Sequence, residues 1–257
     1  MKRRYTDIGI VNTLVSLMES DSERKKRWMG AIGRALEPHG FSVSGRTLWR
    51  RQAGNWAIVS FDWISREEPI TGFYCFVGLT SDVIAGFDGM LRHSSSARLP
   101  GKRPGHAYKC EIFAMLQMFA PDGHLNTRWH IDSRNPPFFV YLSSPEGSVE
   151  DILTDVMRRF DAHVLPLLAK LQTDEQLRDY LVAGGTFGNV PGTYERAILT
   201  RILGPREEFD RAVLELRQAG LGEPGRIAWR RQEVGIDRLI AGDLDARVAD
   251  VDRRPIF

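Results

Sequence analysis

The strongest constraint on the fold is a tryptophan-rich segment, residues 41–65, whose pattern predicts an antiparallel β-hairpin. Taking residues 52–54 as a three-residue loop gives Gly54 the positive-φ position that such loops favour. Alternation along the two strands then places Trp49 and Trp63 together on one apolar face. We therefore expect this face of the hairpin to lie in the core.

The opposite face of the same hairpin is amphipathic and carries Arg46, Arg50 and Trp56. In the predicted register Arg50 lies beside Trp56, where its guanidinium can make a cation–π contact. Arginine and tryptophan are common where proteins recognise one another. These three residues are therefore the candidate interaction site.

A helix is expected directly before the hairpin, over residues 22–38. Trp28, Ile32 and Leu36 recur at helical spacing and form one apolar stripe. Pro38 ends the helix because it lacks a backbone N–H donor. The chain thus begins its core with a helix laid against a sheet.

The remainder of the chain divides into strands followed by helices. Alternating patterns predict strands near 71–80, 108–118, 129–131 and 138–142, with a long loop at 88–105. Capping and turn signals predict helices from about 147 to 171, from 173, at 192–203, 205–219 and 236–248. We therefore expect an α+β fold with a mostly antiparallel sheet of about five or six strands, flanked by helices. The predicted units are residues 1–146, and a C-terminal helical region, 147–257, packed on them or continuous with them.

Composition and charge indicate the compartment in which the protein is expected to work. The 257 residues carry a net charge of +2, yet residues 1–135 hold 19 Lys and Arg against 13 Asp and Glu, whereas residues 136–257 hold 16 against 20. Two cysteines without metal-binding spacing favour a reducing compartment, and no apolar run reaches the length of a membrane span. We expect a cytoplasmic protein with no membrane association.

One cluster of mixed ligand types suggests chemistry, namely His124, His130 and Asp132. In a strand, His130 and Asp132 share a face, as metal ligands or a base and its orienting carboxylate would. No third ligand is defined by the pattern, so a surface or hydrogen-bonded histidine is the preferred interpretation.

Three further features have ordinary explanations. The glycine-rich segment 184–189 precedes a helix but lacks the features of a P-loop, and we interpret it as a connection between helices. Cys110 is expected to be buried among apolar residues. Residues 225–232 repeat six of the eight residues of 45–52, which chance explains in an Arg-rich chain; a second exposed strand is the alternative.

The order of these elements resembles the bacterial domain-of-unknown-function family 4304. The resemblance rests on a helix ending in Leu-Glu-Pro-His-Gly-Phe at 36–41, a Gly-Arg-Thr-Leu-Trp-Arg strand at 45–50 and its partner strand at 55–61. It covers about residues 22–185. It implies the α+β arrangement and no activity, cofactor or site residue.

No nucleophile, metal set or cofactor fingerprint assembles from these patterns, so our leading hypothesis is a non-catalytic binding or interaction protein with a protein partner. We expect no cofactor, and we do not expect nucleic acid as the partner. One alternative is a hydrolase or metal-dependent protein that uses His124, His130 and Asp132. The other is nucleic-acid binding by the basic N-terminal half.

Overall fold

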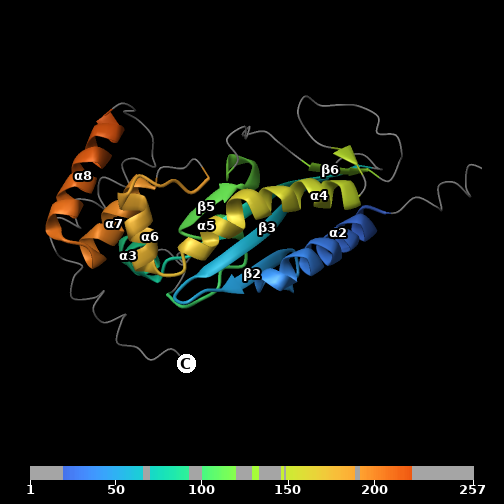
Figure 1. Ribbon diagram of the computed structural model, residues 1–257, viewed down its shortest axis with the longest axis horizontal. Coiled ribbons are helices and arrows are strands. Elements are labelled where there is room, and N and C mark those ends of the chain that lie inside the picture. Colours follow the sequence, from blue (N-terminus) through green and yellow to red (C-terminus); the bar gives the residue numbers. More distant parts are fainter. Residues whose placement is uncertain are drawn as a thin grey trace, which may run out of the picture.

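The computed structural model describes residues 20–65, 70–92, 100–119, 129–132, 146–147, 149–188 and 192–221. In this part of the chain one sheet runs beneath two long helical segments, and further helices gather at one end of it (Figure 1). The expected α+β class is confirmed.

Seven strands of the described chain form the sheet, in the order β1-β2-β3-β4-β6-β7, with β5 also paired to β4. All pairs are antiparallel except β6 with the two-residue β7. The sheet is therefore mostly antiparallel, as predicted. The strands are β1 (Ser42–Ser44), β2 (Thr47–Arg51), β3 (Trp56–Ser65), β4 (Ile70–Leu79), β5 (Ile112–Met115), β6 (Trp129–Asp132) and β7 (Glu146–Gly147).

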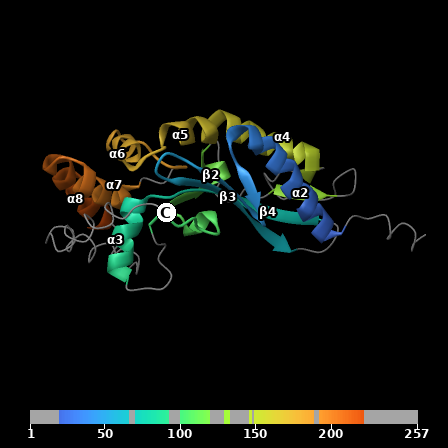
Figure 2. The same cartoon turned by 90° about the horizontal axis from the view of Figure 1, so that it is seen from below.

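Helix α2 (Asp21–Leu36) confirms the predicted first helix. Ser20 caps it, because its hydroxyl accepts from the Glu23 N–H while the Glu23 carboxylate accepts from the Ser20 N–H. The predicted stripe, including Trp28 and Ile32, is fully buried. The helix crosses the sheet on the face that α4 (Val149–Arg159) also covers (Figure 2).

The helices after residue 147 agree with the sequence prediction as far as they are described. One helical rod is formed by α4, a π-helical turn η4 (Phe160–Val164) and α5 (Leu165–Lys170). It is followed by α6 (Asp174–Val182), α7 (Thr193–Leu203) and α8 (Arg206–Leu221). The helix expected at 236–248, the strand expected at 138–142 and the second copy of the octapeptide at 225–232 lie outside the described residues.

The loop predicted at 88–105 is wrong in its first part, because helix α3 (Asp82–Arg92) occupies it. Ser81 begins the helix by accepting from the Ile84 N–H at 3.1 Å, and Ile84 and Phe87 are buried. The strand predicted at 108–118 is also only partly correct, since β5 is flanked by the 3₁₀ turns η2 (Ala107–Lys109) and η3 (Leu116–Phe119).

The predicted register of the first hairpin is wrong by one residue. Arg51 pairs with Trp56 rather than Asn55, and Trp49 pairs with Ile58 rather than Ala57. A shift of one residue moves every side chain of β2 to the other face of the sheet. Trp49 consequently leaves the predicted core face and lies beside Trp56.

Polar contacts at the hairpin tip explain this register. The Gln52 side-chain amide donates to Leu168 O at 2.9 Å, and the Gly54 N–H donates to Gln172 O at 3.1 Å. The Asn55 amide donates to Asp174 Oδ1 at 3.2 Å. These partners lie more than a hundred residues away, so no local turn preference could reveal them. They also cross the predicted boundary after residue 146, and that division stays a prediction.

Candidate functional site

The face of the sheet opposite α2 and α4 is crossed by residues 100–111, which we call the strap (Figure 2). A Cβ atom on Gly78 of β4 would lie 2.6 Å from Ala107 O and 2.6 Å from Cys110 Sγ. Only glycine therefore lets the strap approach the strand this closely. Cys110 is buried there, as predicted, beside Ile58.

Hydrogen bonds fix the strap along its length. Thr47 Oγ1 donates to Gly105 O at 3.0 Å, and the Ala107 N–H donates to Ser60 Oγ at 3.0 Å. At the far end the Ser81 N–H donates to Glu111 Oε2 at 2.9 Å. The strap is thus held to β2, to β3 and to the residues after β4.

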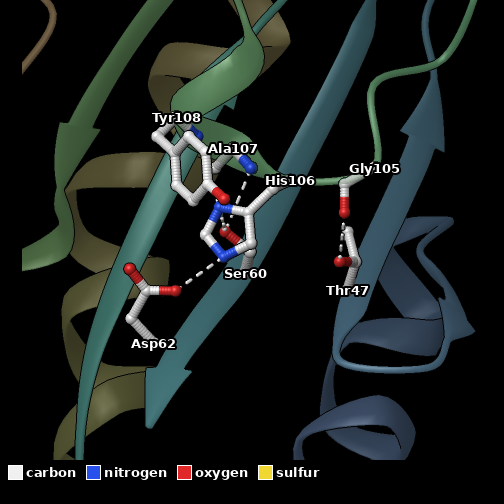
Figure 3. Close-up of polar contacts among 7 residues, drawn as sticks. All are labelled: Thr47, Ser60, Asp62, Gly105, His106, Ala107 and Tyr108. Atoms are coloured by element: carbon white, nitrogen blue, oxygen red, sulfur yellow. Dashed lines mark hydrogen bonds and ion pairs between the residues drawn. The ribbon is translucent and has the colours of Figure 1, made fainter. Parts of the chain in front are cut away.

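His106 is the central polar residue of the strap (Figure 3). Its Nδ1 lies 3.0 Å from Ser60 Oγ and 3.5 Å from the Tyr108 N–H, and its Nε2 lies 2.9 Å from Asp62 Oδ1. Because Ser60 Oγ already accepts from the Ala107 N–H, its hydroxyl proton can point at Nδ1. This network assigns the imidazole proton to Nε2, which faces Asp62.

The surroundings of His106 favour its neutral form. Burial lowers the pKa of His106 from its ordinary value of 6.5, Asp62 opposes the shift, and Arg46 and Lys109 add to the lowering. The ring of Tyr108 covers the imidazole, with centroids 3.9 Å apart. A second proton would have to enter at Nδ1, where two donors already point.

Serine, histidine and aspartate stand here in the order of a hydrolase triad, but Ser60 is 0% exposed beneath the strap. A nucleophilic serine needs open space for a substrate carbonyl beside Oγ, and the Ala107 N–H already occupies part of that space. The arrangement is therefore a clamp that fastens the strap to β3. We call Ser60, Asp62 and His106 the clamp.

The position of His106 in the clamp lets us predict how the free energy of unfolding depends on pH. Because the pKa of His106 is lowered in the folded state, its contribution is present above about pH 6.5 and is lost as the pH falls through the folded-state pKa. We expect the free energy of unfolding, measured by urea denaturation at a series of pH values, to fall more steeply below pH 6.5 in the wild type than in His106→Asn. The exposed His39 supplies the control, since His39→Asn should keep the wild-type slope.

The wild type has to be compared with His106→Asn at each pH, because Asp174 changes the free energy of unfolding with pH in the opposite direction. Burial raises the pKa of Asp174 from 3.8, so its ionisation destabilises the fold as the pH rises. Its carboxylate accepts from the Asn55 amide and, at 3.3 Å, from the Val83 N–H. Equal slopes in the wild type and His106→Asn would contradict the clamp.

Beside the clamp, two arginines each cover a tryptophan. Arg51 Cζ lies 4.6 Å from the centroid of the Trp56 ring, and Arg103 Cζ of the strap lies 4.6 Å from that of Trp49. The two indoles pack edge to face, with centroids 5.4 Å apart. We call these four residues the aromatic–arginine surface.

The charged ends of this surface face solvent. Arg51 and Arg103 are exposed, whereas Trp49 and Trp56 are half-buried against Ile58. Among the described residues no carboxylate lies within ion-pair distance of either guanidinium. β2 and the strap therefore each present one positive charge, stacked on the paired indoles of Trp56 and Trp49.

The structure separates the three residues of the predicted interaction site. Trp56 lies in the aromatic–arginine surface, but Arg51 rather than Arg50 stacks on it, as the shifted register requires. Arg50 instead turns to the other side, where it stacks on Phe41 at 5.1 Å and donates to His39 O at 3.3 Å. Arg46 is exposed in the turn before β2, on the clamp side of the surface.

The predicted chemical cluster cannot be assembled from the described side chains. His130 and Asp132 lie on β6, where only the backbone is described, and His124 lies outside the described residues. In the part of the chain whose side chains are placed, no three His, Cys, Asp or Glu residues are arranged to hold a metal ion. The metal hypothesis is therefore untested at its own residues.

Sequence reasoning missed the clamp and, apart from Trp56, the aromatic–arginine surface. Ser60 and Asp62 alternate on a strand that is otherwise apolar, which signals a polar partner on that face. Nothing near residue 60 identifies that partner as His106. Arg103 likewise reaches Trp49 only because the strap folds back across the sheet.

None of the helices in the described residues is both long enough and apolar enough to cross a bilayer. Comparison of the chain with protein-family models, with curated proteins and with solved structures finds no match.

Proposed function

We propose that this chain is a non-catalytic binding protein that captures an acidic partner protein through the aromatic–arginine surface. The observation that carries the proposal is the pair of stacks, Arg51 on Trp56 and Arg103 on Trp49, both exposed at their guanidinium ends. Arginine and tryptophan dominate the binding energy of protein interfaces.

Rigidity makes this surface suited to recognition. The backbone N–H of Trp56 donates to Thr80 Oγ1 at 2.7 Å, and the backbone N–H of Thr80 donates to Trp56 O at 2.9 Å. Arg103 is carried by the strap, which the clamp holds in place. A guanidinium already stacked on an indole loses less conformational entropy on binding than a free side chain does.

Charge favours an acidic partner. Besides Arg51 and Arg103, the exposed Arg46, Lys102 and Lys109 are supplied by the strap and by the turn before β2. Two described carboxylates close to the strap are engaged, Asp62 with His106 and Glu111 with the Ser81 N–H. Carboxylates of a partner could pair bidentately with the Arg51 and Arg103 guanidinium groups, which make no ion pair with the described residues.

A protein partner fits this surface better than a nucleic acid. Proteins that bind single strands offer open aromatic faces on which bases stack. Here arginines cover the two indoles and the rings pack edge to face, so neither ring is presented flat. The burial of Ser60 weighs against hydrolytic chemistry at the clamp, whereas the hydrolase hypothesis at His124, His130 and Asp132 stays a prediction.

The proposal also covers the compartment and the family. Cys75 and Cys110 are buried and form no disulfide bond, which supports a reducing, cytoplasmic setting. The resemblance to the domain-of-unknown-function family 4304 stays a prediction, and it brings no activity with it.

Charge reversal tests the proposal. Tagged full-length protein would be purified from its native cells, its co-purifying proteins identified, and the affinity of each then measured directly with the purified pair. For the true partner we expect Arg51→Glu with Arg103→Glu to weaken binding about 10- to 100-fold, because two attractive contacts become repulsive.

The matched control reverses two exposed arginines elsewhere, Arg34→Glu on α2 and Arg211→Glu on α8, with the same change in net charge. This control should lower affinity less than threefold. If both double variants weaken binding equally, the effect is one of net charge, and the proposal fails. Preferential binding of single-stranded DNA over every co-purifying protein would overturn it in favour of a nucleic-acid partner.

A further inference from the structure

A second site lies away from the aromatic–arginine surface, at the junction of the π-helical turn, η3 and the connection after α6. It is an open pocket of about 310 Å³, near the lower end of the range found for small-molecule sites. The side chains of Phe119 and Leu167 supply apolar wall, and Met118 and Pro166 extend it.

The polar side chains that line the pocket are basic or uncharged. His163 and Lys170 line it from positions about two turns apart on the same helical rod, and the Tyr180 hydroxyl donates to Thr186 O at 2.9 Å. Among the described residues, no aspartate or glutamate is part of the lining. Lys170 and His163 therefore line a pocket whose described walls contain no carboxylate, which favours an anionic ligand.

The glycine-rich segment forms another wall of this pocket. A Cβ atom on Gly185 would lie 2.5 Å from the ring of Tyr180, and one on Gly188 would lie 2.4 Å from the Ala114 Cβ. Gly188 also has a φ of +58°. These glycines let the segment fold tightly against α6 and the sheet, which places Thr186 and Gly188 in the lining.

The helical wall is irregular at the same place. Phe160–Val164 forms a π-helical turn, in which the Leu165 N–H donates to Phe160 O, and His163 belongs to it. Such turns carry an extra residue and occur frequently at functional sites, where they redirect side chains. The irregular turn and the close-packed glycines thus meet at one pocket.

From these features we infer that the pocket binds a small organic anion with an apolar body, such as a medium-chain carboxylate. Its carboxylate lies at Lys170 and His163, and its apolar body lies against Phe119 and Leu167. The inference is independent of the partner proposed for the aromatic–arginine surface, since the two sites share no residue.

Isothermal titration calorimetry of the full chain with octanoate tests this inference, with octan-1-ol as the uncharged analogue. We expect saturable, single-site binding of octanoate in the low-millimolar range or tighter and at least tenfold weaker binding of octan-1-ol. Lys170→Ala should weaken octanoate binding about fivefold or more, and Lys170→Arg should largely restore it.

Two further variants make the result specific. Ala162 is exposed and lines the pocket, so Ala162→Trp should fill the space and abolish binding while leaving the fold intact by circular dichroism. Lys26→Ala on α2 removes the same charge at a distance and should bind octanoate like the wild type. Absence of saturable binding to the wild type, or binding that Lys170→Ala and Ala162→Trp leave unchanged, would overturn the inference.

Discussion

Replacing Trp28 with alanine should lower the free energy of unfolding by about 3–5 kcal/mol, the cost of removing a large aromatic side chain from a packed core. Trp28 is 0% exposed and lies on α2 at the point where the helix meets the sheet. Its ring packs on Phe61 and Phe73, with centroid separations of 5.6 and 4.8 Å. The cavity would therefore open at the helix–sheet contact itself.

Urea denaturation at neutral pH measures this loss as a shift of the midpoint at constant slope. Trp28→Phe provides the matched comparison, because it keeps a ring against Phe61 and Phe73 while removing the indole N–H. That N–H is buried and has no hydrogen-bond acceptor among the described residues. We expect Trp28→Phe to cost about 1–2 kcal/mol. A loss below about 1 kcal/mol for Trp28→Ala would show that this residue is not in the core.

The second large effect is expected at Gly78, where a single methyl group should displace the strap. The Cβ of Gly78→Ala would lie 2.6 Å from the backbone oxygen of Ala107, a distance that real Cβ atoms do not reach. We expect a loss of about 2–3 kcal/mol, since backbone has to move. The moved strap carries Arg103, so partner binding should weaken as well.

A matched glycine and a relief variant make this prediction specific. Gly54 does not adopt the positive φ predicted for it, and Gly54→Ala places its Cβ 4.0 Å from the nearest atom, Thr173 Cα. This substitution should change stability by less than about 0.5 kcal/mol. Cys110 Sγ is the other atom at 2.6 Å from the new Cβ, so Gly78→Ala with Cys110→Ala should recover part of the loss. A tolerated Gly78→Ala with unchanged partner affinity would contradict the close approach of the strap.

Local periodicity was enough to predict the parts of the fold that depend on neighbouring residues. The stripe of Trp28, Ile32 and Leu36 gave the first helix, and the alternation of β3 correctly placed Trp63 against the core cluster and Trp56 on the other face. In each case one face of a single helix or strand is apolar, and the spacing of apolar residues within that element is enough to identify the face.

The register of β2 could not be predicted in the same way, because it depends on distant partners. A loop rule centred on Gly54 favoured three residues, yet Gln52 and Asn55 are drawn into contacts with Leu168 and Asp174. A buried amide needs hydrogen-bond partners, and here tertiary structure supplies them. One residue of shift was enough to move Trp49 from the predicted core to the aromatic–arginine surface.

The candidate site shows the same limit. Its parts are contributed by β2, β3 and the strap, and the contact of Ser60 with His106 spans 46 residues of chain. The sequence contains the polar alternation of Ser60 and Asp62 and the tryptophans of β2 and β3, but it does not show the path by which the strap returns over them. Trp56 was identified from the pattern, whereas Arg51, Arg103 and His106 required the structure.

The most direct test of partner recognition is a charge-swap experiment on the identified complex. Arg51→Glu with Arg103→Glu should lose binding to the wild-type partner, and a partner in which the contacting acidic residues are changed to arginine should recover at least tenfold of the lost affinity. Such recovery would place the partner's carboxylates at the aromatic–arginine surface. Loss without recovery from any acidic position of the partner, or no loss at all, would contradict the account.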